Sequence, residues 1–377
     1  MASTEAISEE IKMSTRASYT VNYNSSSHFS VITQMWGSTW PKVLPYCIFN
    51  VGLMALLIWL DEKFGKTFVI ELSTQGHSFM TLVVSFLLVS RVTIGLGRYT
   101  EARDGLGVMY REQRELVQNM VIFSDHCLDR AAKEWRQEVG YRGMILLQVV
   151  MAVIDYPTTK IPAWNISELT GDEEEYVRKS TFALSAQARR WAHGLRSEWE
   201  ETMRVPIHLA YLLRKSIHSQ SKRLRTPMSA ANESRLLGSV DSFMSGYYRI
   251  RKFLTTPVPF PLVQMSRTFV FLYIFTVPFV LLQDKSSNVA HYATVFVMTY
   301  GFMGLEIVAI ELDDPFGDDE NDFDNDAMAK TAFEDTYITM ADIDGVEWVD
   351  NLRVRMQNRD RMEQVETEQS WLLSKIV

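Results

Sequence analysis

The segment 286–305, SSNVAHYATVFVMTYGFMGL, contains 20 residues without a single Asp, Glu, Lys or Arg. A helix needs about 20 mostly apolar residues to cross the hydrocarbon core of a bilayer. Directly after it, at 311–328, the chain reads ELDDPFGDDENDFDNDAM, which is dense in carboxylates. This junction predicts an integral membrane protein with an acidic segment at the membrane surface.

Three more runs lack these charged residues. They cover 18 residues at 43–60, 19 residues at 72–90 and 16 residues at 268–283. The four runs form two pairs that are close in sequence, which favours two membrane hairpins over the buried core helices of a soluble protein. The sequence therefore predicts an all-α protein with four transmembrane helices in two hairpins, continuous with a cytosolic helical bundle.

The segment between the hairpins, 91–266, carries 25 of the 38 Lys and Arg residues. Apolar residues recur at helical spacing over 101–129, and further helices are expected over 183–204, 205–222 and 232–253. The apolar run within 140–156 is too short to span, so we expect a buried soluble helix there. The excess of basic residues places this helical region on the cytosolic or stromal side.

The predicted organisation follows from these boundaries. We expect an N-terminal segment at 1–35, a first transmembrane hairpin at 36–95, a helical region at 96–255, a second hairpin at 256–312, and an acidic segment with the C-terminal tail at 313–377.

Composition excludes several classes of protein. The 47% of hydrophobic residues exclude a disordered chain, and two cysteines exclude a disulfide scaffold or a cysteine-based zinc site. No nucleophile elbow, phosphate loop, zinc-protease motif or dinucleotide fingerprint occurs in the sequence. We therefore expect no enzyme activity and no nucleic-acid partner.

The run at 72–90 has a face that could line a pore. Leu82, Phe86 and Ser90 recur four residues apart, and Arg91 and Arg98 follow them. A ring of apolar side chains can gate a pore by dewetting, and basic residues below it would favour anions. The alternative is an ordinary lipid-facing or packing surface. Because four helices cannot enclose a wide pore, a channel requires a symmetric oligomer.

The acidic segment has nine acids within 311–326, arranged around a Pro-Phe-Gly turn. Oxygen-rich clusters of this kind suit Ca²⁺, which takes six to eight oxygen ligands. The segment is not an EF-hand, because Ala327 stands where that motif requires Gly. A charged helix start or a solvated linker is the alternative.

Three stretches resemble the bestrophin family of anion channels. The sequence DPFGDDENDF at 314–323 resembles the family signature N-P-F-G-E-D-D-D-D-F, and TPVPFP at 256–261 resembles the stretch that opens the third membrane helix. The run from Ser85 through Arg98 to Gly105 resembles the pore helix and its continuation in plant and bacterial members. The resemblance covers about residues 20–345.

The resemblance implies a homopentamer with one central pore. It puts a narrow apolar neck at Leu82, Phe86 and Ser90, although the family usually has an aromatic residue where Ser90 stands. Arg91 and Arg98 would attract anions toward this neck.

The resemblance also implies a calcium clasp in the acidic segment. Side chains matching Asp319 and Asp322 and backbone carbonyls matching Glu311 and Asp314 would bind Ca²⁺. This chain keeps the acidic cluster that plant and bacterial members often lack.

From residues and resemblance together we expect passive conduction of chloride, with a response to calcium. A bicarbonate channel of a photosynthetic membrane and a non-conducting membrane scaffold remain alternatives. The membrane itself, plasma membrane or thylakoid, stays open.

Overall fold

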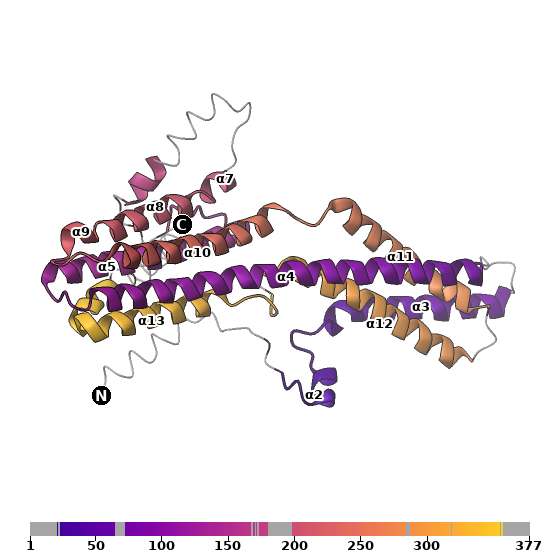
Figure 1. Cartoon of the computed structure of the whole chain (residues 1–377). Coiled ribbons are helices and arrows are strands. Elements are labelled where there is room, and N and C mark those ends of the chain that lie inside the picture. The colour runs from indigo at the N-terminus through magenta and orange to yellow at the C-terminus, as the bar shows by residue number, and fades with distance from the viewer. Residues whose placement is uncertain are drawn as a thin grey trace, which may run out of the picture. The chain divides into compact units, whose positions relative to one another are not determined.

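A computed structural model of the chain describes residues 21–356, apart from 22, 65–71, 167–168, 170, 172, 180–197, 284–286, 318 and 355. Most of the helix expected at 183–204 lies outside the described residues, as do residues 1–20 and 357–377 of the expected terminal segments. The described part is helical and has no β-strand, as the sequence predicts (Figure 1). Its named helices are α2 (His28–Thr33), α3 (Trp40–Phe64), α4 (Thr74–Ser124), α5 (Arg130–Thr159), α7 (Glu198–Thr202), α8 (Val205–His218), α9 (Gln220–Arg223), α10 (Ala230–Thr255), α11 (Phe260–Leu281), α12 (Asn288–Asp313) and α13 (Asn325–Asp344).

The chain divides into two compact units. The first contains Met1–Ala102 and Thr255–Phe323, and the second contains Arg103–Leu254 and Asp324–Val377. The apolar helices α3, α11 and α12 belong to the first unit, and α5, α8, α9 and α13 belong to the second.

Helix α4 covers most of the charge-free run at 72–90 and most of the helical pattern at 101–129. The sequence predicts a helical region continuous with the membrane helices, and the structure has one helix of 51 residues here. No proline occurs between its ends, so nothing removes a backbone donor and interrupts the hydrogen-bond ladder. The change from apolar to charged side chains alters what the helix contacts without ending it.

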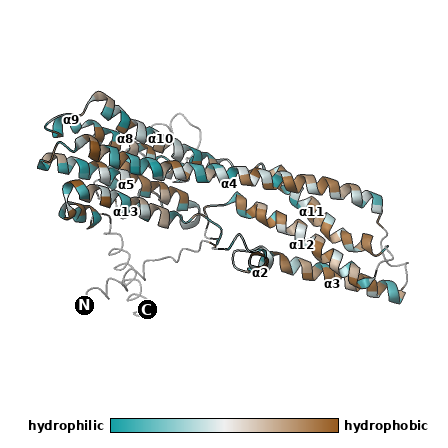
Figure 2. Cartoon of the chain, turned by 60° about the horizontal axis from the view of Figure 1, so that its bottom comes forward, coloured by the Kyte–Doolittle hydropathy of each residue, from teal (hydrophilic) through white to brown (hydrophobic). Residues whose placement is uncertain are grey.

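The first unit has an apolar core. Helix α12 packs against α3 and α11, and α11 also packs against α3. Apolar residues, brown in Figure 2, follow these helices for most of their length. Inside this core Asn50 donates to the Ile274 carbonyl (3.1 Å) and to Thr299 Oγ1 (2.8 Å), so one amide joins three helices. The core side chains include Val43, Cys47, Met54, Val84, Leu88, Val270, Tyr273, Ile274, Val277, Val295 and Met303.

Burial separates α5 from the other apolar helices. Among the described residues five helices are long and apolar enough to cross a membrane: α3, α4, α5, α11 and α12. The apolar window of α5 is 72% buried within the chain, against 22–39% for the other four. A helix already covered by protein has little surface left for lipid. This burial agrees with the expectation of a buried helix at 140–156.

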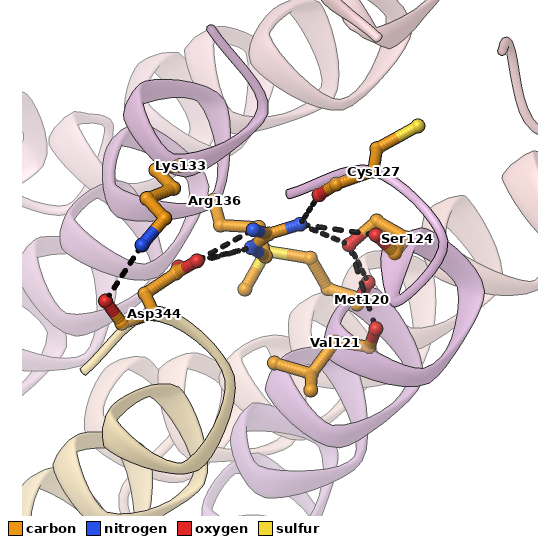
Figure 3. A network of polar contacts seen from close by, with 7 residues as sticks. All are labelled: Met120, Val121, Ser124, Cys127, Lys133, Arg136 and Asp344. Atoms are coloured by element: carbon orange, nitrogen blue, oxygen red, sulfur yellow. Dashed lines mark hydrogen bonds and ion pairs between the residues drawn. The ribbon is translucent and has the colours of Figure 1, made fainter. Parts of the chain in front are cut away.

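In the second unit a buried arginine joins the ends of three helices (Figure 3). Arg136 on α5 is fully buried and ion-paired with Asp344, the last residue of α13, at 2.5 Å. Its other donors reach the carbonyls of Ser124 and Cys127, at the end of α4 and just beyond it. The guanidinium therefore satisfies carbonyl groups that a helix end leaves without intrahelical partners.

Helices α4 and α10 approach closely at two glycines of the second unit. A Cβ placed on Gly246 would lie 2.7 Å from the carbonyl oxygen of Gly105 and 2.8 Å from Met109 Cγ. A backbone oxygen cannot turn aside as a flexible side chain can. The close approach therefore requires glycine at position 246.

We predict that Gly246→Ala destabilises the protein by about 1–3 kcal/mol, because the added methyl group overpacks the contact. Gly238→Ala on the same helix is the matched control, since a Cβ there meets nothing within 4 Å. Alanine is the better helix former, so the control should gain up to about 1 kcal/mol. Thermal unfolding of the detergent-solubilised protein measures both. Equal shifts in Tm would contradict the close approach.

A second prediction concerns the buried ion pair. Asp344→Asn leaves the Arg136 charge without its counter-ion, and breaking a buried pair in this way costs about 3–5 kcal/mol. Asp342→Asn, two residues earlier at an exposed position, should change stability by less than about 0.5 kcal/mol. The measurement is the same unfolding experiment, and a Tm equal in the two variants would show that the pair contributes nothing.

Candidate functional site

One face of α4 is apolar and uncovered within the first unit. Leu82 and Phe86 are 67% and 72% exposed, and Phe79 and Val89 lie beside them with most of their surface exposed. The residues 79, 82, 86 and 89 are spaced alternately three and four apart, the spacing of a single stripe on a helix. We call these four residues the open face of α4.

The opposite face of α4 is buried. Val84 and Leu88 are fully buried in the helix core. At Gly95 the helix lies so close to α12 that a Cβ would be 3.1 Å from Leu312 Cβ. This packing determines the rotation of α4 about its axis, and so turns the open face away from the core.

Only two of the three predicted neck residues lie on the open face of α4. Leu82 and Phe86 belong to the open face, whereas Ser90 is only partly exposed and sits next to the buried Arg91. Val89 is the exposed residue of that turn. The four-residue spacing pointed to Ser90, and the alternating spacing of three and four would have found Val89.

Arg91 differs most from its expected surroundings. It is 2% exposed, and its Nη2 donates to Asp313 Oδ2 at 2.7 Å. Its Nε lies 3.4 Å from Glu306 Oε1, and Arg267 donates to the same carboxylate oxygen at 3.0 Å. Two cations and two anions thus form one balanced cluster. The positive charge of Arg91 points into the protein, toward acids, so the expectation of an anion-attracting side chain does not match its contacts.

Arg98 lies one turn before the second unit begins and is partly exposed. Its Nη1 donates to the carbonyl oxygen of Thr256 at 2.6 Å. That contact joins α4 to the segment before α11, where the Thr-Pro motif stands. Arg98 therefore holds two chain segments together, and its side chain is only partly exposed, with Nε buried.

The acidic residues gather in a turn after α12. Asp322 accepts a hydrogen bond from the backbone of Asp319 at 2.6 Å, and Phe323 donates to the Pro315 carbonyl at 3.0 Å. Gly317 is pressed against the turn, since a Cβ there would lie 2.9 Å from Asp322 Oδ2. We call residues 311–323 the acidic turn. Asp324, just beyond it, caps α13 by accepting from Ala327 at 2.9 Å.

A lysine and an asparagine join the acidic turn to the start of α3. Lys42 Nζ lies 3.2 Å from Glu311 Oε1 and 3.6 Å from Asp319 Oδ2. Asn321 donates to Glu311 Oε2 at 2.9 Å and to the Gly37 carbonyl at 3.1 Å. Asp319, a predicted side-chain ligand, therefore already faces an ammonium group, as does the side chain of Glu311, whose backbone carbonyl is the predicted ligand. Lys42 cannot be recognised from the sequence, because nothing in the sequence shows that it meets residues about 270 positions later.

The surroundings of Asp322 disfavour its charged form. Burial raises the pKa of Asp322 to about 6, and the negative charges of Asp319, Asp314 and Glu311 add to the effect. A carboxylate repelled by its neighbours is stabilised by any added cation.

As placed, these residues are not a finished metal site. Among the described residues no three His, Cys, Asp or Glu side chains converge closely enough to hold a metal ion. Lys42 Nζ lies between the side-chain carboxylates of Glu311 and Asp319. The acidic turn thus has the donors that Ca²⁺ uses, without the convergence that a preformed calcium site needs.

Comparisons with known proteins agree with this architecture. The chain is 35% identical over 306 residues to the voltage-dependent anion channel-forming protein YneE of Salmonella typhi, covering 80% of this chain and 88% of that protein. It is 33% identical over 298 residues to the YneE protein of Escherichia coli K12, covering 76% and 82%. These named relatives are channels, which points away from enzyme activity.

Solved structures share the fold. A bacterial bestrophin homolog from Klebsiella pneumoniae superposes with a TM-score of 0.60 at 18% identity, covering 79% of this chain and 98% of that chain. The family model described as bacterial and fungal bestrophin protein matches residues 20–336, most of the chain. The chain therefore belongs to the bestrophin family.

Proposed function

We propose that this chain is the subunit of a passive anion channel, a homopentamer whose central pore conducts chloride. The observation that carries the proposal is the open face of α4. It is apolar and continuous, and the subunit's own core leaves it uncovered. The names of the relatives support the same class of activity.

The open face suits the wall of a narrow pore. Five copies around an axis would place five Phe86 rings and five Leu82 side chains at matching heights. Such apolar rings exclude water until the pore widens, and this exclusion is how a hydrophobic constriction gates. Lipid could cover the same surface in a subunit that forms no pore, and that arrangement is the scaffold alternative.

Anion preference would come from charge near the neck. Arg98 is partly exposed close to residue 102, where the first unit's part of α4 ends, and Arg91 is neutralised in its cluster. We therefore assign the anion-attracting role to Arg98. Chloride is our first choice of ion and bicarbonate the second, and replacement of one by the other in reversal-potential measurements distinguishes them.

We further propose that the acidic turn responds to calcium. Its support is the surroundings of Asp322, whose pKa is raised first by burial and then by the repulsion of the negative charges on Asp319, Asp314 and Glu311. Calcium would relieve this repulsion in competition with the Lys42 ammonium, with Asp319 and Asp322 as side-chain ligands and Glu311 and Asp314 as carbonyl ligands. The choice between the plasma membrane and the thylakoid stays open, and finding the membrane that contains the protein in the cell would decide it.

The pore assignment predicts the effect of Phe86→Ala. Removing five rings from the neck should raise the chloride conductance of protein in planar bilayers by roughly twofold or more, because the constriction becomes wider and wetter. Phe49→Ala is the matched control, since Phe49 is a similarly exposed phenylalanine on α3. If the wild type conducts and the Phe86→Ala variant has the same conductance, the open face does not line the pore. Wild-type protein without current would favour the scaffold.

The acidic turn predicts a link between calcium and pH. Because Asp322 holds its proton up to about pH 6, protons compete with Ca²⁺ at lower pH. Lowering the pH from 7 to 5 should weaken the apparent calcium affinity, measured from the current, roughly tenfold, the competition expected of one such carboxyl. Lys42→Met should strengthen the affinity, because a competing charge is removed.

The control variants separate calcium binding from general charge effects. Asp319→Ala combined with Asp322→Ala should abolish the calcium response, whereas Asp342→Ala, an exposed acid on α13, should keep it. A double variant that remains as calcium-dependent as wild type would refute the site. Chloride current without any calcium response would leave the channel intact and make the acidic turn purely structural.

A further inference from the structure

The second unit contains an open pocket of about 400 Å³ between α8 and α10. Arg214 enters it from α8, and Asp241, Ser245, Tyr248, Arg249 and Lys252 line it from α10. The α10 residues lie 4, 7, 8 and 11 positions after Asp241, so they share one broad face of that helix. Neither the neck nor the acidic turn contributes a residue to this pocket.

The pocket carries a net positive charge. Arg214 Nη2 is paired with Asp241 Oδ1 at 2.6 Å, which neutralises both groups and holds the arginine in place. Arg249 and Lys252 add two positive charges on the same side of α10, and both residues are exposed. With one acid and three bases, the side chains that line the pocket carry two net positive charges.

The remaining lining has both polar and apolar parts. Ser245 and Tyr248 are exposed and carry hydroxyl groups that can donate hydrogen bonds. Met244 is buried and forms an apolar part of the wall beside the Tyr248 ring. Ligand pockets typically combine an apolar wall with a few polar groups in this way, and their volumes begin at about 300 Å³.

We propose that this pocket binds a small phosphate-bearing anion. The guanidinium of Arg249 can hold two phosphate oxygens in its planar fork, and Lys252 adds a point charge beside it. Ser245 donates to a third oxygen, and the organic part of the ligand lies on Tyr248 and Met244. A phosphate ester suits both the volume of the pocket and the positive charge of its lining. A bare halide is too small to fill the volume and carries only one negative charge. The ligand is either a soluble phosphate compound or the headgroup of a phospholipid.

Binding of sodium pyrophosphate to the full chain in phosphatidylcholine nanodiscs, followed by calorimetry, tests the soluble source. Replacing both Arg249 and Lys252 by Gln should weaken binding at least tenfold. Arg235→Gln is the matched control, an exposed arginine on α10 outside the pocket, and should change the affinity less than twofold. Asp241→Asn should tighten binding at least twofold, because it removes the one acid and frees Arg214.

Nanodiscs that also contain phosphatidylinositol 4-phosphate test the headgroup source, with retained lipid counted by native mass spectrometry. Retention by the wild type and loss in the Arg249 and Lys252 double variant would support the pocket with a lipid ligand. Three results would overturn the proposal: no binding of either probe to the wild type, equal binding to the double variant, or an equal loss in Arg235→Gln. The Asp241→Asn variant moves affinity in the opposite direction, so misfolding cannot imitate the expected pattern.

Discussion

The first unit depends on how it buries charge. Arg91 and Glu306 are each 2% exposed inside an apolar helix group, and Arg267 and Asp313 complete the balance. An unpaired charge in such surroundings costs several kcal/mol, so these four residues must meet for the helices to pack. The pairing therefore determines which part of α12 lies against α4 and which way α4 is turned.

That rotation has consequences along α4. With Arg91 held against α12 and Gly95 in close contact with it, Leu82 and Phe86 can only face away from the core. One rotation of α4 therefore places the charged cluster inside the helix group and the open face outside it. A second polar contact, the Asn50 amide between α11 and α12, orients α3 in the same core.

The sequence predicts which segments form helices better than it predicts which segments these helices contact. Runs without charged residues correctly indicate α3, α11 and α12, because hydropathy and length belong to each segment alone. The expected continuity of the membrane helices with the helical region is seen in α4, where the change of polarity does not end the helix because no proline interrupts it. The buried helix at 140–156 is recognised because its apolar run is too short to span.

Site residues are harder, because their roles come from neighbours that are distant in sequence. Arg91 looks like an exposed anion attractor until Glu306 and Asp313 are seen beside it, more than 200 residues away along the chain. Lys42 and the acidic turn meet over a similar separation. That Leu82 and Phe86 share one face of α4 follows from sequence alone, because periodicity within one helix is enough to group them, and their role in a neck stays a prediction.

The open face of α4 also bears on how subunits would come together. Inside a bilayer, lipid chains cover apolar side chains as well as protein does, so covering Phe86 releases no water and gains little hydrophobic free energy. Several large apolar side chains of the second unit are also exposed, among them Ile122, Tyr211 and Ile338. Where water covers these residues, association gains the full hydrophobic term, which weakens on cooling. Assembly driven from the second unit would then weaken on cooling. The packing of α4 against neighbouring subunits would determine the geometry of the assembly and contribute little to the affinity between subunits.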